Sequence, residues 1–276
     1  MSGMYAEFEN AGATFTGDVF EPDMPNGHGV VLCHGLGTNR NELYDVAEAL
    51  RDEGFVVLAY DERAHGQSEG IFHLDTMVDD VHAARRYLEN AYDVDRIGMF
   101  GHSLGGYLAA RAAAERDGFD AVVTWAAAIS PREVLKETQP WFDVIDAWVD
   151  TVGRHLHYSS SYKELRIDDM GDYLANLYDR DQVRTDDSVK ALGDVPYTLI
   201  QGDADKVVSM HHAKAIAAAA DTELVVVPDC GHSCLPTHSE PPFYLPEPDR
   251  PEARREVIAT VVGRFQRYLV DAPGTR

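Results

Sequence analysis

Residues 101–105 read Gly-His-Ser-Leu-Gly and lie between two segments of different character. The segment before them, 96–100, is short and mostly apolar, as a buried strand is, and the segment after them, 106–115, is rich in strong helix formers. The glycines allow a sharp turn with close backbone packing, which holds the central serine in a strained conformation with its hydroxyl exposed. The N-terminus of the following helix would stabilise negative charge beside it. The pattern therefore predicts that Ser103 is a nucleophile.

Along the rest of the chain, apolar segments alternate with segments of helical spacing. Two short segments separated by Asn-Ala-Gly predict an antiparallel hairpin over 4–8 and 13–20. Further strands are expected at 29–33, 55–60, 96–100, 121–125, 197–201 and 224–227, and helices at 41–53, 75–91, 106–115, 209–220 and 255–269. Strands that alternate with helices form a mainly parallel sheet covered on both faces. We therefore expect one α/β domain over residues 1–276, built on an eight-stranded sheet.

The alternation stops between residues 131 and 194, where we expect no buried strand. One amphipathic helix is indicated by the spacing of Trp141, Phe142, Ile145, Trp148, Val149 and Val152. The polar segment 158–170 predicts loops or a short hairpin, and a further short helix is expected near residues 173–177. An excursion between two core strands lies over the carboxyl ends of the strands, where such sheets bind ligands. We interpret 131–194 as a cap inserted into the domain.

A serine nucleophile needs a base and an acid that orients the base. His232 comes just after the last predicted strand, so it should emerge at the carboxyl edge of the sheet. Asp205 follows the strand 197–201, with Asp203 as the alternative acid. The chain order of serine, aspartate and histidine is the one expected for a serine at a strand-to-helix turn of this kind. The sequence thus predicts a triad of Ser103, Asp205 and His232.

An oxyanion hole is also needed, and it is expected at the end of the third strand. Residues 34–37 read His-Gly-Leu-Gly and follow that strand directly. The second donor normally comes from the residue after the nucleophile. We therefore expect the backbone N–H groups of Leu36 and Leu104 to bind the oxyanion, a role that requires no particular side chain.

These motifs together resemble those of the α/β-hydrolase superfamily, over roughly residues 30–125 and 197–269. Residues 61–68, Asp-Glu-Arg-Ala-His-Gly-Gln-Ser, are similar to a loop of these families. This chain differs from the loop at Ala64, where the families usually have glycine. The residues of segment 202–208 match the acid motif, which favours Asp205 over Asp203. Within the superfamily, the chain is most similar to cinnamoyl/feruloyl-type esterases and to monoacylglycerol-lipase-like serine hydrolases.

The resemblance implies a cofactor-free acyl-enzyme mechanism. His232 would take the proton of Ser103, the serine would attack an acyl carbonyl, and water would then release the acid. The expected substrate is a small-molecule carboxylic ester with a small or medium acyl group. Peptidases or amidases, acyltransferases and cofactor-free haloperoxidases use the same triad, so the sequence does not separate them. A non-catalytic binding protein is the alternative outside enzymes, and the complete triad argues against it.

Two stretches are candidates for substrate binding. Trp141 and Trp148 are seven residues apart and share a helical face, so they either pack the cap or line an acyl or aromatic pocket. A loop with five prolines over residues 235–248 follows the catalytic histidine, and it is longer than in the families that the chain resembles. Its Phe243 and Tyr244 are candidates for one wall of the pocket. Alternatively, the loop packs on a second subunit of a homodimer or lies on the surface. The sequence favours none of these three interpretations over the others.

The three cysteines do not form a disulfide framework, and we expect thiols. Cys33 is expected to be a small core residue. Cys230 and Cys234 flank His232, but a metal site is disfavoured because no second cluster of ligands is evident. We expect His65 to brace its loop by hydrogen bonds rather than to titrate in catalysis.

Acidic residues outnumber basic ones by 47 to 24, which gives a formal charge of −23. This charge repels phosphates and so argues against nucleic acid and anionic membranes as partners. The first residues lack the features of a signal peptide, and no apolar segment is long enough to span a bilayer, so we expect a cytoplasmic protein. Only 5 of the basic residues are lysine. A carboxylate-rich surface with few lysines resembles the proteins of salt-in halophiles.

Transfer from molar to millimolar KCl is therefore expected to unfold or inactivate the protein, because low salt no longer screens the repulsion between carboxylates. Circular dichroism and activity, measured after dialysis across this range, check the expectation. Equal stability at both salt concentrations would instead indicate an ordinary acidic protein from a GC-rich genome.

Overall fold

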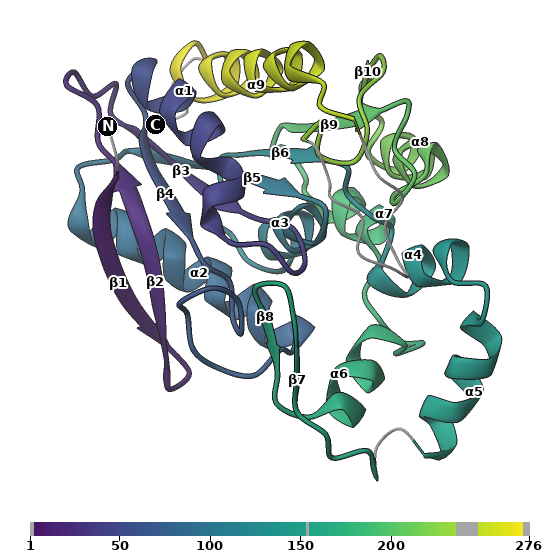
Figure 1. Cartoon of the computed structure of the whole chain (residues 1–276). Helices are drawn as coiled ribbons and strands as arrows, with labels where there is room; N and C mark the ends of the chain where they lie inside the picture. Colours follow the sequence, from purple (N-terminus) through teal and green to yellow (C-terminus); the bar gives the residue numbers. More distant parts are fainter. Residues whose placement is uncertain (1–2, 153–154, 236–247, 273–276) are drawn as a thin grey trace.

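The computed structural model describes residues 3–152, 155–235 and 248–272. At its centre, the described chain forms an eight-stranded sheet with the strand order β1-β2-β4-β3-β5-β6-β9-β10 (Figure 1). The strands are β1 (Met4–Asn10), β2 (Ala13–Phe20), β3 (His28–Cys33), β4 (Val56–Tyr60), β5 (Arg96–His102), β6 (Ala121–Trp125), β9 (Tyr197–Gly202) and β10 (Leu224–Val227). Strand β2 pairs antiparallel with β1 and β4, and the other pairings are parallel. The predicted α/β architecture is confirmed.

Helices cover both faces of this sheet, as Figure 1 shows. The helices are α1 (Tyr44–Asp52), α2 (Leu74–Ala91), α3 (Leu104–Glu115), α8 (Met210–Ala220) and α9 (Pro251–Phe265), with a 3-10 turn, η1 (Arg40–Leu43), before α1 and a π turn, η4 (Gln266–Val270), after α9. Alternate side chains of β3 point to opposite faces: Val31 packs in the cluster with α2, α3 and α8, and Val30 packs in the cluster with α1 and α9. The carboxyl ends of β3, β5, β9 and β10 therefore lie at one edge, between two packed layers.

The segment between β6 and β9 contains helices and a small hairpin of its own. Its elements are α4 (Pro131–Thr138), α5 (Phe142–Thr151), β7 (Ser160–Tyr162), β8 (Leu165–Ile167), α6 (Met170–Leu177), α7 (Thr185–Ser188) and η3 (Val189–Ala191). The predicted helix around Trp148 is α5, and the short hairpin is β7 with β8. Helix α4 was not predicted, although Ser130 caps its N-terminus and Pro131 occupies its first turn.

The expectation of no buried strand in this segment was wrong for β8. Leu165 is fully buried and Ile167 is 5% exposed. The reason is a backbone contact with the loop 61–68: the Arg166 N–H donates to the carbonyl of Ala64 at 2.8 Å, and the Gly66 N–H donates to that of Glu164 at 2.9 Å. The hairpin is thus held against the core loop and buries its apolar side chains there.

Candidate active site

The backbone is packed very tightly at the turn between β5 and α3. A Cβ on Gly101 would lie 2.1 Å from the carbonyl oxygen of Gly105, and a Cβ on Gly105 would lie 2.1 Å from that of Cys33. No side chain fits at either position, which explains both glycines. Ser103, between them, has a φ of 55°, which lies in a backbone region that residues other than glycine rarely adopt. The expected strained turn is therefore present.

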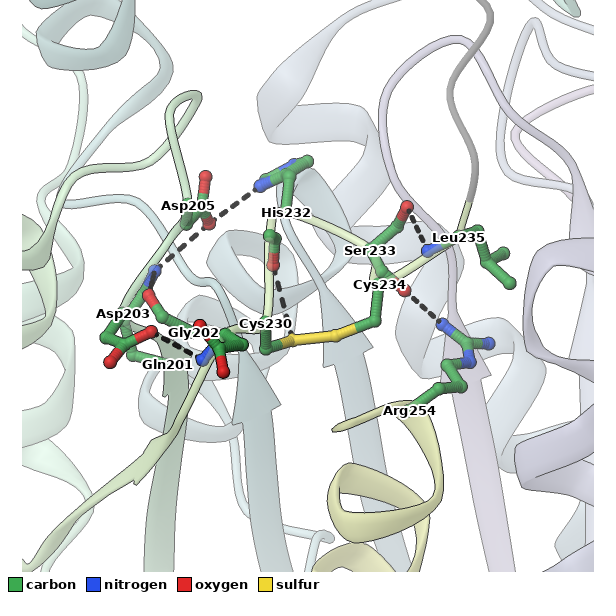
Figure 2. The surroundings of a disulfide bond; sticks show 12 residues. Gln201, Gly202, Asp203, Asp205, Cys230, His232, Ser233, Cys234, Leu235 and Arg254 are labelled. Carbon is green, nitrogen blue, oxygen red and sulfur yellow. Dashed lines mark hydrogen bonds and ion pairs between the residues drawn. A yellow bond between two sulfur atoms is a disulfide. The ribbon is translucent and has the colours of Figure 1, made fainter. Parts of the chain in front are cut away.

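The structure brings the three predicted triad residues together. The Oγ of Ser103 lies 2.9 Å from Nε2 of His232, and Nδ1 of His232 lies 2.9 Å from Oδ2 of Asp205. Figure 2 shows Asp205 and His232 directed toward each other from the loops after β9 and β10. The alternative acid, Asp203, instead accepts a hydrogen bond from the N–H of Asp229 at 2.8 Å. Ser103, His232 and Asp205 thus form one hydrogen-bonded chain.

Asp205 is held as a buried carboxylate. Its Oδ1 accepts the N–H groups of Val207 and Val208 at 2.8 and 2.9 Å, and its Oδ2 also accepts from Nε2 of Gln201 at 3.0 Å. Burial by itself would raise the pKa of Asp205. The charge and hydrogen bond of His232 and the two backbone donors outweigh burial and lower that pKa. Asp205 is therefore the ionised partner that fixes Nδ1 of the imidazole as a donor.

The expected oxyanion donors lie beside the serine. Leu36 and Leu104 line the same cavity as Ser103. Helix α3 begins at Leu104, whose N–H, as the first of a helix, has no carbonyl partner within the helix. The Gly105 N–H donates to the carbonyl of His34 at 3.1 Å and so ties the start of α3 to the loop 34–37. Both backbone segments of the predicted hole are thus adjacent to the serine.

His65 supports the loop 34–37 through a hydrogen bond to its backbone. Its Nδ1 lies 2.9 Å from the carbonyl oxygen of Arg63, and its Nε2 accepts the N–H of Gly37 at 3.1 Å. Burial lowers the pKa of His65 to about 3, so the ring is neutral and makes both bonds with a single proton on Nδ1. The prediction that His65 braces its loop by hydrogen bonds is confirmed.

Glu42, on η1, is a buried carboxylate at the site that sequence reasoning missed. Its Oε2 accepts the N–H of Gly35 at 2.8 Å and the hydroxyl of Thr38 at 3.0 Å, and its Oε1 lies 3.2 Å from Nδ1 of His102. The other ring nitrogen of His102 lies 2.9 Å from the carbonyl oxygen of His232. Glu42 thus connects the loop 34–37, through His102, to the backbone of His232.

The charge of Glu42 is maintained by these contacts. Burial alone would raise the pKa of Glu42, but the charge and hydrogen bond of His102, with the donated Gly35 N–H, lower it well below its usual range. His102 had a signal in the sequence, since it directly precedes Ser103. Glu42 had none, because it stands in no motif and reaches the site only through the turn that η1 makes after β3.

An apolar cavity of about 160 Å³ adjoins Ser103. Besides the serine and its neighbours, it is lined chiefly by aliphatic side chains of α4 and of the loop after β9, among them Pro131, Val134, Leu135, Val207 and Val208. Thr138 and Gln139 are polar residues in its lining, which also includes Tyr162.

Of the four predicted substrate-binding residues, the two that the structure describes do not line this cavity. Trp141 is 70% exposed, and Trp148 is half-buried against the core; neither lines the cavity. Phe243 and Tyr244 lie outside the described residues. A large part of the cavity wall comes instead from α4, the helix that the sequence analysis did not predict.

The expectation that Cys230 and Cys234 are thiols was wrong: their sulfurs form a disulfide. Cys234 has a φ of 55°, and this left-handed turn brings its Cα to 5.2 Å from that of Cys230. Cys33 is a free, buried cysteine, as predicted. Within the described ranges, no group of three or more histidines, cysteines and carboxylates is placed to hold a metal ion, and no helix is long and apolar enough to cross a membrane.

A model of the serine aminopeptidase S33 family matches residues 25–192, more than half of the chain. The chain belongs to this family. The matched region includes the turn at Ser103, the loop 34–37 and most of the segment 131–194, whereas Asp205 and His232 lie beyond it. Est1E from Butyrivibrio proteoclasticus, solved with bound ferulic acid, superposes on this family member with a TM-score of 0.70 at 18% identity, over 96% of this chain and 99% of that chain. This likeness shows the α/β-hydrolase fold.

Curated relatives of this S33 family member include esterases and lipases. Esterase EstD of Thermotoga maritima is 32% identical over 147 residues, 48% of this chain and 35% of that protein. A monoacylglycerol lipase of Mycolicibacterium smegmatis is 24% identical over 237 residues, 78% of this chain and 84% of the lipase. Two uncharacterized proteins of Mycobacterium tuberculosis are 28% identical over 75% of this chain, which spans 64% of their length.

Glu42→Gln is expected to make the free energy of unfolding depend less on pH in the acid range. A carboxyl with a lowered pKa stabilises the fold above its unfolded-state pKa, about 4.3, and this contribution is lost as pH falls. Between pH 5 and pH 3, the free energy of unfolding of the wild type should fall by on the order of 1 kcal/mol more than that of the variant. Urea titrations across this range measure the difference. Glu252→Gln, at an exposed position, is the control, and a wild-type-like slope in Glu42→Gln would contradict the role of this charge.

Proposed function

We propose that the protein is a serine hydrolase that cleaves carboxylic esters of small or medium apolar acyl groups through an acyl-enzyme on Ser103. The observation that carries this proposal is the chain of 2.9 Å contacts from Ser103 through His232 to Asp205, at the wall of an apolar cavity. Ester hydrolysis is also the activity named for two of the relatives, an esterase and a monoacylglycerol lipase.

The contacts of His232 suit it to move the proton in both halves of the reaction. Its Nε2 would take the proton of Ser103 as Oγ bonds to the acyl carbon, and would give it to the departing alcohol when the ester C–O bond breaks. A water molecule would then attack the acyl-enzyme in the same way and release the acid. Asp205 would stabilise the imidazolium formed in each half and keep the ring oriented.

The oxyanion of each tetrahedral intermediate would be bound by the N–H groups of Leu36 and Leu104. Such donors stabilise the transition state most when they are fixed before reaction. Glu42 and His65 hold the loop 34–37 through the N–H groups of Gly35 and Gly37, so these two buried side chains would supply that rigidity.

The cavity favours an uncharged, apolar acyl group. Its wall contains aliphatic side chains of α4, and no carboxylate is among the described residues that line it. We propose that the segment 131–194 acts as the cap, with α4 as the part that contacts the acyl chain. The substrate would be a small molecule, and the triad would work without a cofactor.

A peptidase is the second candidate, because the family model is that of a serine aminopeptidase. An aminopeptidase binds the α-ammonium group of its substrate, which calls for a carboxylate near the nucleophile. The apolar lining of the cavity therefore favours the ester. A panel of nitrophenyl esters of increasing acyl length, compared with aminoacyl nitroanilides, separates the two.

Ser103→Ala is expected to abolish turnover of the nitrophenyl esters, because the reaction needs the serine oxygen. For the same reason, the variant should not be labelled by a fluorophosphonate probe. Asp205→Asn should lower kcat by about 10⁴-fold, since an amide no longer selects the correct imidazole tautomer. Asp203→Asn is the matched control and should keep wild-type kcat, because its carboxylate contacts the N–H of Asp229 outside the triad. Full esterase activity in Ser103→Ala would rule out the proposed mechanism.

Val134→Trp is expected to shift the preference toward short acyl groups. Val134 lines the cavity from α4, so a larger side chain there would fill the space for the acyl chain. Activity on butyryl and hexanoyl nitrophenyl esters should fall by at least about 10-fold relative to acetyl ester, as expected for methylene-scale discrimination in an apolar pocket. Val144→Trp makes the same substitution at a position that is 63% exposed on α5 and should leave the profile unchanged. An unchanged profile in Val134→Trp would place the acyl chain elsewhere.

A further inference from the structure

The catalytic histidine lies midway between two disulfide-bonded cysteines. Cys230 and Cys234 stand two residues before and two residues after His232, and Figure 2 shows their bond beneath the segment that carries its ring. Neither cysteine is exposed to solvent. The mechanism proposed above does not use this bond, and its place around His232 calls for an explanation.

The first cysteine is fixed to the loop that carries the acid. The carbonyl of Cys230 accepts the N–H of Ala204 at 3.0 Å. The same carbonyl oxygen would lie 2.1 Å from a Cβ on Gly202, so the two backbones are in direct contact there. Cys230 therefore has a fixed position relative to Asp205, independent of the disulfide.

The second cysteine begins the path to the last helix. Its carbonyl accepts the N–H of Arg250 at 3.1 Å, and Arg254 of α9 donates to the carbonyl of Ser233 at 3.1 Å. Cys234 adopts a φ of 55°, which is unfavourable for a residue with a side chain. The disulfide joins this strained residue directly to the fixed Cys230.

The small size of the closed loop indicates a local role. A disulfide restricts the unfolded chain more when the loop that it closes is longer, and here only residues 231–233 lie between the cysteines. The bond therefore adds little to the constraint of the unfolded chain as a whole. Its principal effect falls on the backbone of His232.

We propose that Cys230 and Cys234 are positioning residues, whose disulfide holds His232 in reach of Ser103 and Asp205, so that catalysis depends on the thiol redox state of the protein. The inference rests on the proposed function and extends it to regulation of the same site. With the bond broken, Cys234 is free to leave the left-handed region, and the carbonyl of His232 moves relative to His102. A shift of about 1 Å in a catalytic group lowers turnover by roughly 100-fold.

The switch is a thiol–disulfide exchange. A thiolate of a small dithiol attacks one sulfur of the Cys230–Cys234 bond, which breaks and leaves a mixed disulfide between the reductant and that cysteine. The second thiolate of the reductant then attacks the reductant's own sulfur in this mixed disulfide and releases the cysteine as a thiolate. Two electrons and two protons pass to the protein, which ends with two thiols, and the reductant ends as a cyclic disulfide. Because both sulfurs are buried, the exchange requires opening of the segment 230–234 and is slow.

The test compares oxidised and dithiothreitol-reduced wild type. Thiols are counted by alkylation and mass spectrometry, and kcat and KM are measured on a nitrophenyl ester. Oxidised protein should have one thiol, Cys33, and reduced protein three. Reduction should lower kcat by roughly 10- to 100-fold with KM little changed, slow fluorophosphonate labelling of Ser103, and leave the far-ultraviolet circular dichroism unaltered; reoxidation should restore kcat.

Two variants separate this effect from general sensitivity to reductant. Cys230→Ser/Cys234→Ser should have the low kcat of reduced wild type and should not respond to dithiothreitol. Cys33→Ala removes the cysteine outside the disulfide, so it should respond as wild type does. If the double variant does not fold, the reversible loss of kcat in folded wild type still decides the question.

An equal kcat in oxidised and reduced wild type would overturn the inference, and so would three thiols in protein treated with oxidised glutathione. Retained dithiothreitol sensitivity in the double variant would overturn it too. Failure of the proposed function looks different: oxidised wild type would then neither hydrolyse the esters nor label at Ser103.

Discussion

The close approach of three backbone segments determines the rest of the site. The start of α3 packs against the ends of β3 and β5 so tightly that Gly101 and Gly105 have no room for a Cβ. This contact places the serine on a strained turn, brings the first N–H of α3 beside the loop 34–37, and points the helix N-terminus at the reacting atoms. A single steric constraint thus positions the proposed nucleophile and both proposed oxyanion donors. The proposed base and acid follow β10 and β9, which lie farther along the same sheet.

Buried polar groups then keep these parts in register with one another. Glu42 contacts the loop 34–37 and His102, and His102 contacts the backbone of His232. A buried carboxylate is stable only when its partners are in place, so these contacts form together or not at all. The disulfide between Cys230 and Cys234 brackets the same histidine segment. The geometry of His232 is thus determined by its backbone surroundings as much as by its own ring contacts.

Much of this arrangement could be predicted from the sequence, because apolar periodicity and chain order report on the core. The eight strands of the central sheet, the helices that cover it and the three residues of the chain of contacts at Ser103 were predicted, and the match to a motif selected Asp205 over Asp203. The disulfide could not be predicted, since the spacing of Cys230 and Cys234 says nothing of the left-handed turn that joins them. Glu42 and the cavity-lining face of α4 depend on tertiary packing, which no local pattern encodes. Trp141 and Trp148 were chosen for size and spacing alone, and packing placed them outside the cavity.

One side of the cavity wall and the proposed triad come from different parts of the chain. Ser103, Asp205 and His232 stand at the ends of core strands, whereas Pro131, Val134 and Leu135 belong to a helix inserted between β6 and β9. Mutations in that insertion can reshape the cavity without altering the residues that form the tight backbone contact at Gly105. A substitution on the cavity side of α4 therefore changes the shape of the cavity, while the chain of contacts from Ser103 through His232 to Asp205 lies outside the altered segment.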